Sequence, residues 1–120
     1  MRPLVFTQRF VPQQRVDCSP LVPNGLAGKS VREVAALELQ SGNRKLRVGD
    51  LFRLSGEDAQ NVVIECESDK LERIGARMTG GSVRVQGDCG VYVGLQMRGG
   101  EIHVAGSTGA FAACQMRGGI

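Results

Sequence analysis

The pentapeptide Gln-Met-Arg-Gly-Gly occurs twice, at residues 96–100 and 115–119, and this sets a repeat of 19 residues. The same shift aligns residues 75–93 with residues 94–112, where 7 of 19 positions are identical. Self-similarity at a fixed period indicates a chain built from stacked, similar units. A unit of this size is too short for a pair of helices, because helical repeats need about 33 residues or more.

Equivalent positions of the repeat carry the same kinds of residue. Glycines recur singly and in pairs, one methionine recurs, and aliphatic residues recur two positions apart. We take these as structural positions, and they are Gly75, Met78, Gly80, Gly81, Val83, Val85, Gly87, Gly90, Gly94, Met97, Gly99, Gly100, Ile102, Val104, Gly106, Gly109, Met116, Gly118 and Gly119. Glycine at fixed places predicts turns that need a positive φ or a close backbone approach.

Each unit contains a short alternating stretch, residues 83–85 and then residues 102–104. Alternation with period 2 predicts a strand with its aliphatic residues on one face. Arg84 and His103 then lie on the outward face, where they are candidates for contact with a partner. The 19-residue period predicts two inward ladders of aligned residues, which are Ile64, Val83 and Ile102 in one and Cys66, Val85 and Val104 in the other.

These patterns predict an all-β fold, a right-handed parallel β-helix with 19-residue coils. The coils occupy residues 51–120, and residues 1–50 form a small mixed N-terminal cap with one short helix. A left-handed hexapeptide-repeat helix is disfavoured, because no subperiod of six is found. The sequence stops at Ile120, where the next strand would begin. We therefore expect a coil cut short, a fragment of a longer protein, and possible self-association through the open edge.

The first fifty residues contain all four prolines of the chain, which predicts extended or irregular structure from Phe10 to Pro23. Ser30 and Glu33 have the spacing of a capping box, in which each side chain bonds the other residue's backbone N–H. This predicts a short helix from Ser30 to about Leu37. Strand and turn are expected between Leu39 and Leu54.

Composition argues against several classes of function. The net charge of +3 is small, the basic residues are scattered and the aromatic content is 4%, which is unlike a nucleic-acid-binding protein. The apolar runs are too short to span a membrane. Cys18, Cys66, Cys89 and Cys114 form no Cys-x-x-Cys pair, so we expect reduced thiols in the cytoplasm and no zinc site.

Three features of the sequence resemble binding or catalytic sites, and each has a simpler structural interpretation. Residues 25–30 resemble a phosphate-binding loop, but Pro23 stands where that motif needs glycine. His103 is the only histidine, and one histidine does not make a typical metal site. An acidic cluster could do acid–base work, and it consists of Glu65, Glu67, Asp69 and Glu72. Glu65 and Glu67 alternate with inward residues, so the cluster is expected on a solvated face. The sequence therefore predicts no catalytic, cofactor-binding or metal-binding residue.

The repeat is specific enough to suggest a family. The stretch from Ile74 to Gly90, and its continuation from Val93 to Gly106, resembles the C subunit of formylmethanofuran dehydrogenase, a family that includes the C subunit of the bacterial formyltransferase/hydrolase complex. Residues 25–30 and 49–52 resemble the N-terminal part of that family, so the resemblance covers about residues 20–120. A more distant similarity is to the glycine-rich C-terminal β-helix of glutamate synthase.

The resemblance implies a non-catalytic structural subunit of an oxidoreductase or formyl-transfer complex in one-carbon metabolism, as found in methanogenesis and methylotrophy. Its partners would be the other protein subunits, with neither nucleic acid nor membrane involved. Molybdenum or tungsten pterin, iron–sulfur clusters and zinc would lie on those other subunits, and this chain would hold no cofactor.

Two alternatives remain open from the sequence. A self-assembling scaffold of the cytoskeletal type would form end-to-end filaments. An acyltransferase built on a β-helix would need a histidine base, for which His103 is the candidate, and His103→Ala would then abolish turnover.

Overall fold

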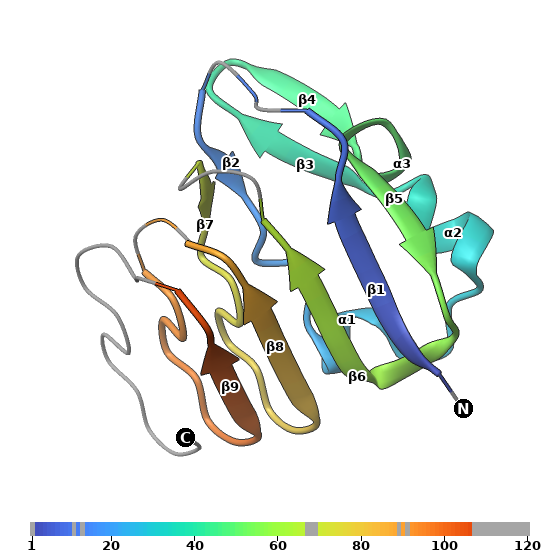
Figure 1. The fold of residues 1–120 in the computed structure, drawn as a ribbon, viewed down its shortest axis with the longest axis vertical. Coiled ribbons are helices and arrows are strands. Elements are labelled where there is room, and N and C mark those ends of the chain that lie inside the picture. The colour runs from blue at the N-terminus through green and yellow to red at the C-terminus, as the bar shows by residue number, and fades with distance from the viewer. Residues whose placement is uncertain are drawn as a thin grey trace.

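The computed structural model describes residues 2–10, 12, 14–66, 70–88, 90 and 92–106. These residues form two β-sheets, one of five strands and one of four, together with three short helices (Figure 1). In the described part of the chain, no helix has the length and apolar character needed to cross a membrane.

The five-stranded sheet has the strand order β5-β1-β6-β8-β9. Its strands are β1 (Pro3–Gln8), β5 (Phe52–Ser55), β6 (Asp58–Glu65), β8 (Ser82–Gln86) and β9 (Glu101–Val104). β1 pairs antiparallel with β5 on one side and parallel with β6 on the other. β6, β8 and β9 then follow in parallel. The N-terminal strand is therefore an interior strand of this sheet (Figure 1).

The four-stranded sheet has the order β4-β3-β2-β7. Its strands are β2 (Val16–Asp17), β3 (Glu38–Ser41), β4 (Arg44–Arg47) and β7 (Leu71–Glu72). β3 pairs antiparallel with both β2 and β4, whereas β2 pairs parallel with β7. Each sheet therefore combines both orientations.

The prediction of an all-β, right-handed parallel β-helix is wrong. Both sheets are mixed, and helices lie between the strands of the first half of the chain. The prediction extended the pattern of residues 75–106 to the whole fold. The antiparallel pairs that overturn it involve β1 to β5, which precede the repeat and carry no sign of its period.

The predicted inward ladders are also wrong at β6. Val62 pairs with Val83 and Ile64 pairs with Val85, which is an offset of 21 residues. Between β8 and β9 the offset is 19, with Val83 opposite Ile102. A shift of two residues keeps every side chain on the same face of a strand, because side chains alternate with period 2. The alternation therefore fixes the inward face but not the partner.

The three helices are α1 (Pro23–Leu26), α2 (Val31–Ala35) and α3 (Val48–Leu51). The predicted capping box at α2 is confirmed: Ser30 Oγ accepts from the Glu33 backbone N–H at 3.2 Å, and Glu33 Oε1 accepts from the Ser30 N–H at 3.0 Å. Hydrogen bonding to Ser30, first of all from its backbone N–H, favours the ionised carboxylate and lowers the pKa of Glu33. α1 was not predicted, and its first residue is proline, which suits the start of a helix.

One hydrophobic cluster joins the inner residues of both sheets and the helices. From the five-stranded sheet it includes Leu4, Phe6 and Ile64, and from the four-stranded sheet Leu39 and Leu71. Phe6 and Phe52 meet edge to face, with ring centroids 5.7 Å apart, a favoured aromatic geometry. The rest of this core is made mainly of aliphatic and methionine side chains.

Candidate functional site

The repeat turns lie between β7 and β8 and between β8 and β9. Met78 and Met97 occupy equivalent places and are fully buried. Val83 and Val85 are buried in β8, while Ile102 and Val104 of β9 are half-buried against the same cluster. The backbone N–H of Arg98 donates to the Met78 carbonyl at 2.8 Å, so the second turn is hydrogen-bonded to the first.

The repeat glycines differ in conformation and surroundings. Five of them have a positive φ, namely Gly75, Gly81, Gly87, Gly94 and Gly100. Gly99 and Gly106 approach backbone carbonyls closely, so that an added Cβ would lie 2.5 Å from Thr79 O and 2.4 Å from Gly87 O. Gly80 has open space around it. Gly90 donates its N–H to the Leu71 carbonyl at 2.7 Å.

Several residues singled out in the sequence lie outside the described part of the chain. Among the repeat positions these are Gly109, Met116, Gly118 and Gly119, which include the second Gln-Met-Arg-Gly-Gly copy. The same holds for Glu67, Asp69, Cys89 and Cys114.

Arg84 and His103, predicted to face a partner, lie directly opposite each other on β8 and β9. Arg84 is exposed, and 53% of the His103 side chain is accessible, with its Nε2 3.1 Å from Glu101 Oε2. The row continues across the sheet through Val63 of β6 to Val5 of β1. We call these four residues the outer row. It combines two half-buried valines with two groups that can carry positive charge.

The repeat turns form a hollow of about 300 Å³ lined by Arg77, Thr79, Gln96 and Arg98, here called the arginine hollow. Arg77 Nε donates to Gln96 Oε1 at 3.2 Å. These four residues were not predicted as a site. The signal that could have identified them is the polar residue on each side of the repeated methionine, at 77 and 79 and again at 96 and 98.

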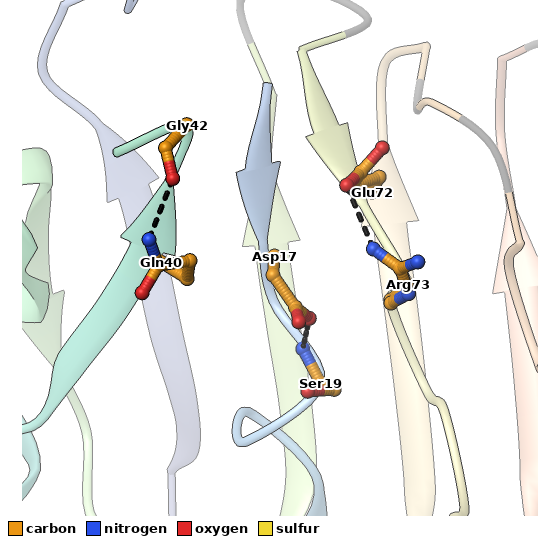
Figure 2. Close-up of polar contacts among 6 residues, drawn as sticks. All are labelled: Asp17, Ser19, Gln40, Gly42, Glu72 and Arg73. Atoms are coloured by element: carbon orange, nitrogen blue, oxygen red, sulfur yellow. Dashed lines mark hydrogen bonds and ion pairs between the residues drawn. The ribbon is translucent and has the colours of Figure 1, made fainter. Parts of the chain in front are cut away.

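The four-stranded sheet carries polar side chains on β3, β2 and β7, and each makes a local contact (Figure 2). Gln40 Nε2 donates to the Gly42 carbonyl at 2.6 Å, and Asp17 Oδ1 accepts from the Ser19 N–H at 2.9 Å. Glu72 Oε1 accepts from Arg73 Nη1 at 2.9 Å. In Figure 2 each dashed line joins two residues that are one or two positions apart in the chain.

A second hollow, of about 190 Å³, is lined by Asp17, Ser19, Pro20, Glu38, Gln40 and Lys45. Its lining combines two carboxylates with one ammonium group, so its charges are of mixed sign. The arginine hollow, whose charged lining residues are both cations, has the more definite chemistry.

Among the described residues, no three of His, Cys, Asp and Glu lie close enough to hold a metal ion together. Cys18 is buried and Cys66 half-buried, and neither forms a disulfide. Of the predicted acidic cluster, Glu65 and Glu72 lie in the described part of the chain. Glu65 Oε1 accepts from Thr7 Oγ1 at 2.7 Å, and Glu72 pairs with Arg73.

The chain is similar in sequence to the C subunits of two kinds of complex. It is 39% identical over 77 residues to the C subunit of the formyltransferase/hydrolase complex Fhc of Methylorubrum extorquens, covering 64% of this chain and 29% of that protein. It is 33% identical over 98 residues to the C subunit of tungsten-containing formylmethanofuran dehydrogenase 2 of Methanothermobacter thermautotrophicus, covering 78% of this chain and 36% of that protein. The resemblance expected from the sequence is thus confirmed, whereas no family model matches the chain.

A solved structure supports the same relationship. The crystal structure of the Methylorubrum extorquens formyltransferase/hydrolase complex (FhcABCD) with methylofuran contains a chain that superposes with a TM-score of 0.86 at 38% identity. The match covers 96% of this chain and 43% of that one. The fold is therefore shared, and the chain spans about a third of the length of the curated relatives it matches.

Proposed function

We propose that this chain is part of a C subunit that holds together a formyltransferase/hydrolase or formylmethanofuran dehydrogenase complex of one-carbon metabolism, and that it is not itself catalytic. The observation that carries the proposal is the match to a chain of such a complex over 96% of this chain, at 38% identity. The partners are then the other protein subunits, in the cytoplasm.

The structural role is supported by where the reactive side chains lie. His103 pairs with a neighbouring carboxylate at an exposed strand, Glu72 is neutralised by Arg73, and the described cysteines pack in or against the core. General acid–base and nucleophilic groups need partners that hold and tune them around a reacting atom. These groups are spread over separate elements. Tungsten or molybdenum chemistry, which the names of the dehydrogenase relatives state, is assigned by this proposal to other subunits.

The proposal is tested by deleting the gene and restoring it as the full-length wild type or His103→Ala. Without the chain, the partner subunits should separate on native gels and the formyl-transfer activity of the extract should fall. Wild type should restore assembly and activity, and every complex that assembles with His103→Ala should be active. An assembled complex that is inactive only with His103→Ala would contradict a purely structural role and favour catalysis. Unchanged assembly after deletion would contradict the proposal as a whole.

A further inference from the structure

The arginine hollow brings together side chains from two successive repeat turns. Arg77 and Thr79 flank the buried Met78, and Gln96 and Arg98 flank the buried Met97. The two turns are joined through backbone hydrogen bonds, from Arg77 N–H to Leu95 O and from Arg98 N–H to Met78 O, both at 2.8 Å. The guanidinium groups are therefore carried by backbone that is fixed next to each methionine.

The backbone at these positions is also constrained. Arg77 and Gln96 both have a left-handed conformation, with φ of 60° and 55°. Non-glycine residues adopt this region infrequently and at a cost, so it marks positions that the surrounding structure determines. In this conformation Arg77 Nε donates to the Gln96 side-chain oxygen at 3.2 Å, which orients the guanidinium toward the second turn.

The charge of the hollow is not neutralised by the described part of the chain. Arg73, four residues before Arg77, is bridged to Glu72, and its guanidinium carbon lies 5.3 Å from the centre of the Tyr92 ring. By contrast, no described carboxylate forms an ion pair with Arg77 or Arg98. Two cations facing one concave surface repel each other, and an anion placed between them offsets that repulsion.

The side-chain chemistry fits a carboxylate. A guanidinium presents a planar fork of N–H donors that matches the two oxygens of a carboxylate. Thr79 adds a hydroxyl to the same lining, and hydroxyls both donate and accept.

A free anion gains little here, because the contacts between exposed charges are weakened by water, and both arginines are exposed. A carboxylate on a partner polypeptide is held in place by the rest of its interface, which raises its effective concentration at the hollow.

We propose that the arginine hollow receives an aspartate or glutamate side chain from a neighbouring subunit. This inference rests on the proposed function and adds to it a specific contact. The arginine hollow shares no residue with the outer row. The proposed contact gives a role to the polar residues on either side of each buried methionine.

The test uses the complex purified through the tagged, full-length protein, in four versions. These are wild type, the double variant Arg77→Gln/Arg98→Gln, the conservative variant Arg98→Lys, and Arg53→Gln as a control. Arg53 is an exposed arginine on β5, outside the arginine hollow. The readout is the rate at which the protein leaves the complex as NaCl is raised, and the melting temperature of each isolated chain shows that folding is intact.

The double variant should dissociate at least about tenfold faster than wild type, Arg98→Lys should fall between them, and Arg53→Gln should stay within about twofold. A double variant that melts like wild type and dissociates at the wild-type rate would overturn the inference and leave the proposed function standing. A wild-type chain that assembles with no other subunit would overturn both. Inorganic phosphate is the second probe: phosphate binding lost in the double variant, with complex stability unchanged, would mark a free-anion site and also overturn the inference.

Discussion

At the scale of the residue, adjacent glycines in one turn have different roles. Gly81 has a φ of 77°, and an added Cβ would lie 2.7 Å from the Gln60 carbonyl oxygen. Its neighbour Gly80 has nothing within 4 Å of that position. Gly81→Ala should therefore lower the free energy of unfolding by about 1–3 kcal/mol, and Gly80→Ala should leave it unchanged or raise it by up to about 1 kcal/mol. Urea denaturation of both variants tests this, and equal losses would contradict the assignment.

The repeated methionine offers a second matched pair of residues. Met97 is 1% exposed, whereas Arg98 beside it is exposed. Truncating a buried methionine leaves a cavity, so Met97→Ala should cost about 2–5 kcal/mol of stability. Arg98→Ala should change stability by no more than about 0.5 kcal/mol. Thermal unfolding separates the two cases. A neutral Met97→Ala would show that the turn does not contribute to the core.

At the scale of the element, α2 begins with a local structure that responds to pH. The pKa of Glu33 lies below its ordinary value of 4.5, chiefly because its carboxylate accepts the Ser30 backbone N–H. The ionised carboxylate therefore stabilises the fold above that ordinary value, and the contribution is lost as the pH falls through the lowered pKa. The hydrogen bond with the Ser30 side chain is the second cause of the lowered pKa. Ser30→Ala removes it and keeps the backbone N–H, so it should raise the pKa of Glu33 part of the way toward 4.5 and lower the melting temperature. NMR titration of the Glu33 carboxyl carbon, with Gln40→Ala as control, tests this; an unmoved pKa would contradict it.

Asp58 at the start of β6 follows the same physics. The Asn61 side chain donates to Asp58 Oδ2 at 2.7 Å and the Gln60 N–H donates to Oδ1 at 3.1 Å, which together lower the pKa of Asp58. Asn61→Ala should raise that pKa toward its ordinary value, because the contact with the larger effect is lost. The same NMR titration reports it, and a pKa that stays low would assign the effect to the backbone alone.

The elements also show how much of the fold the sequence can predict. The capping box at Ser30 and the inward face of β8 follow from local spacing, and both are found. The pairing of Val62 with Val83 does not follow, because a slip of two residues preserves the alternation. The outward residues of the arginine hollow could have been predicted from their places beside each methionine, but which of them meet across turns depends on register.

At the scale of the whole molecule, the mixed topology depends on contacts far apart in the sequence. β1 lies between β5 and β6, more than forty residues later in the chain, and no repeat or local pattern in residues 3–8 indicates those partners. The resemblance to a subunit of a larger assembly was carried by the repeat and could be predicted, whereas the arrangement of the first half could not. The division of the chain at residue 50 stays a prediction.

The central claim, that the chain acts as a structural subunit, is tested most directly by purifying the tagged full-length protein from its own cells under native conditions. Mass spectrometry then identifies the polypeptides that accompany it in fixed proportion. The account predicts formyltransferase and hydrolase subunits, as the name of the Methylorubrum extorquens complex states; a tungsten- or molybdenum-containing subunit in their place would identify the dehydrogenase. Recovery of the chain only with itself, in species of increasing size, would contradict the account and favour a self-assembling scaffold.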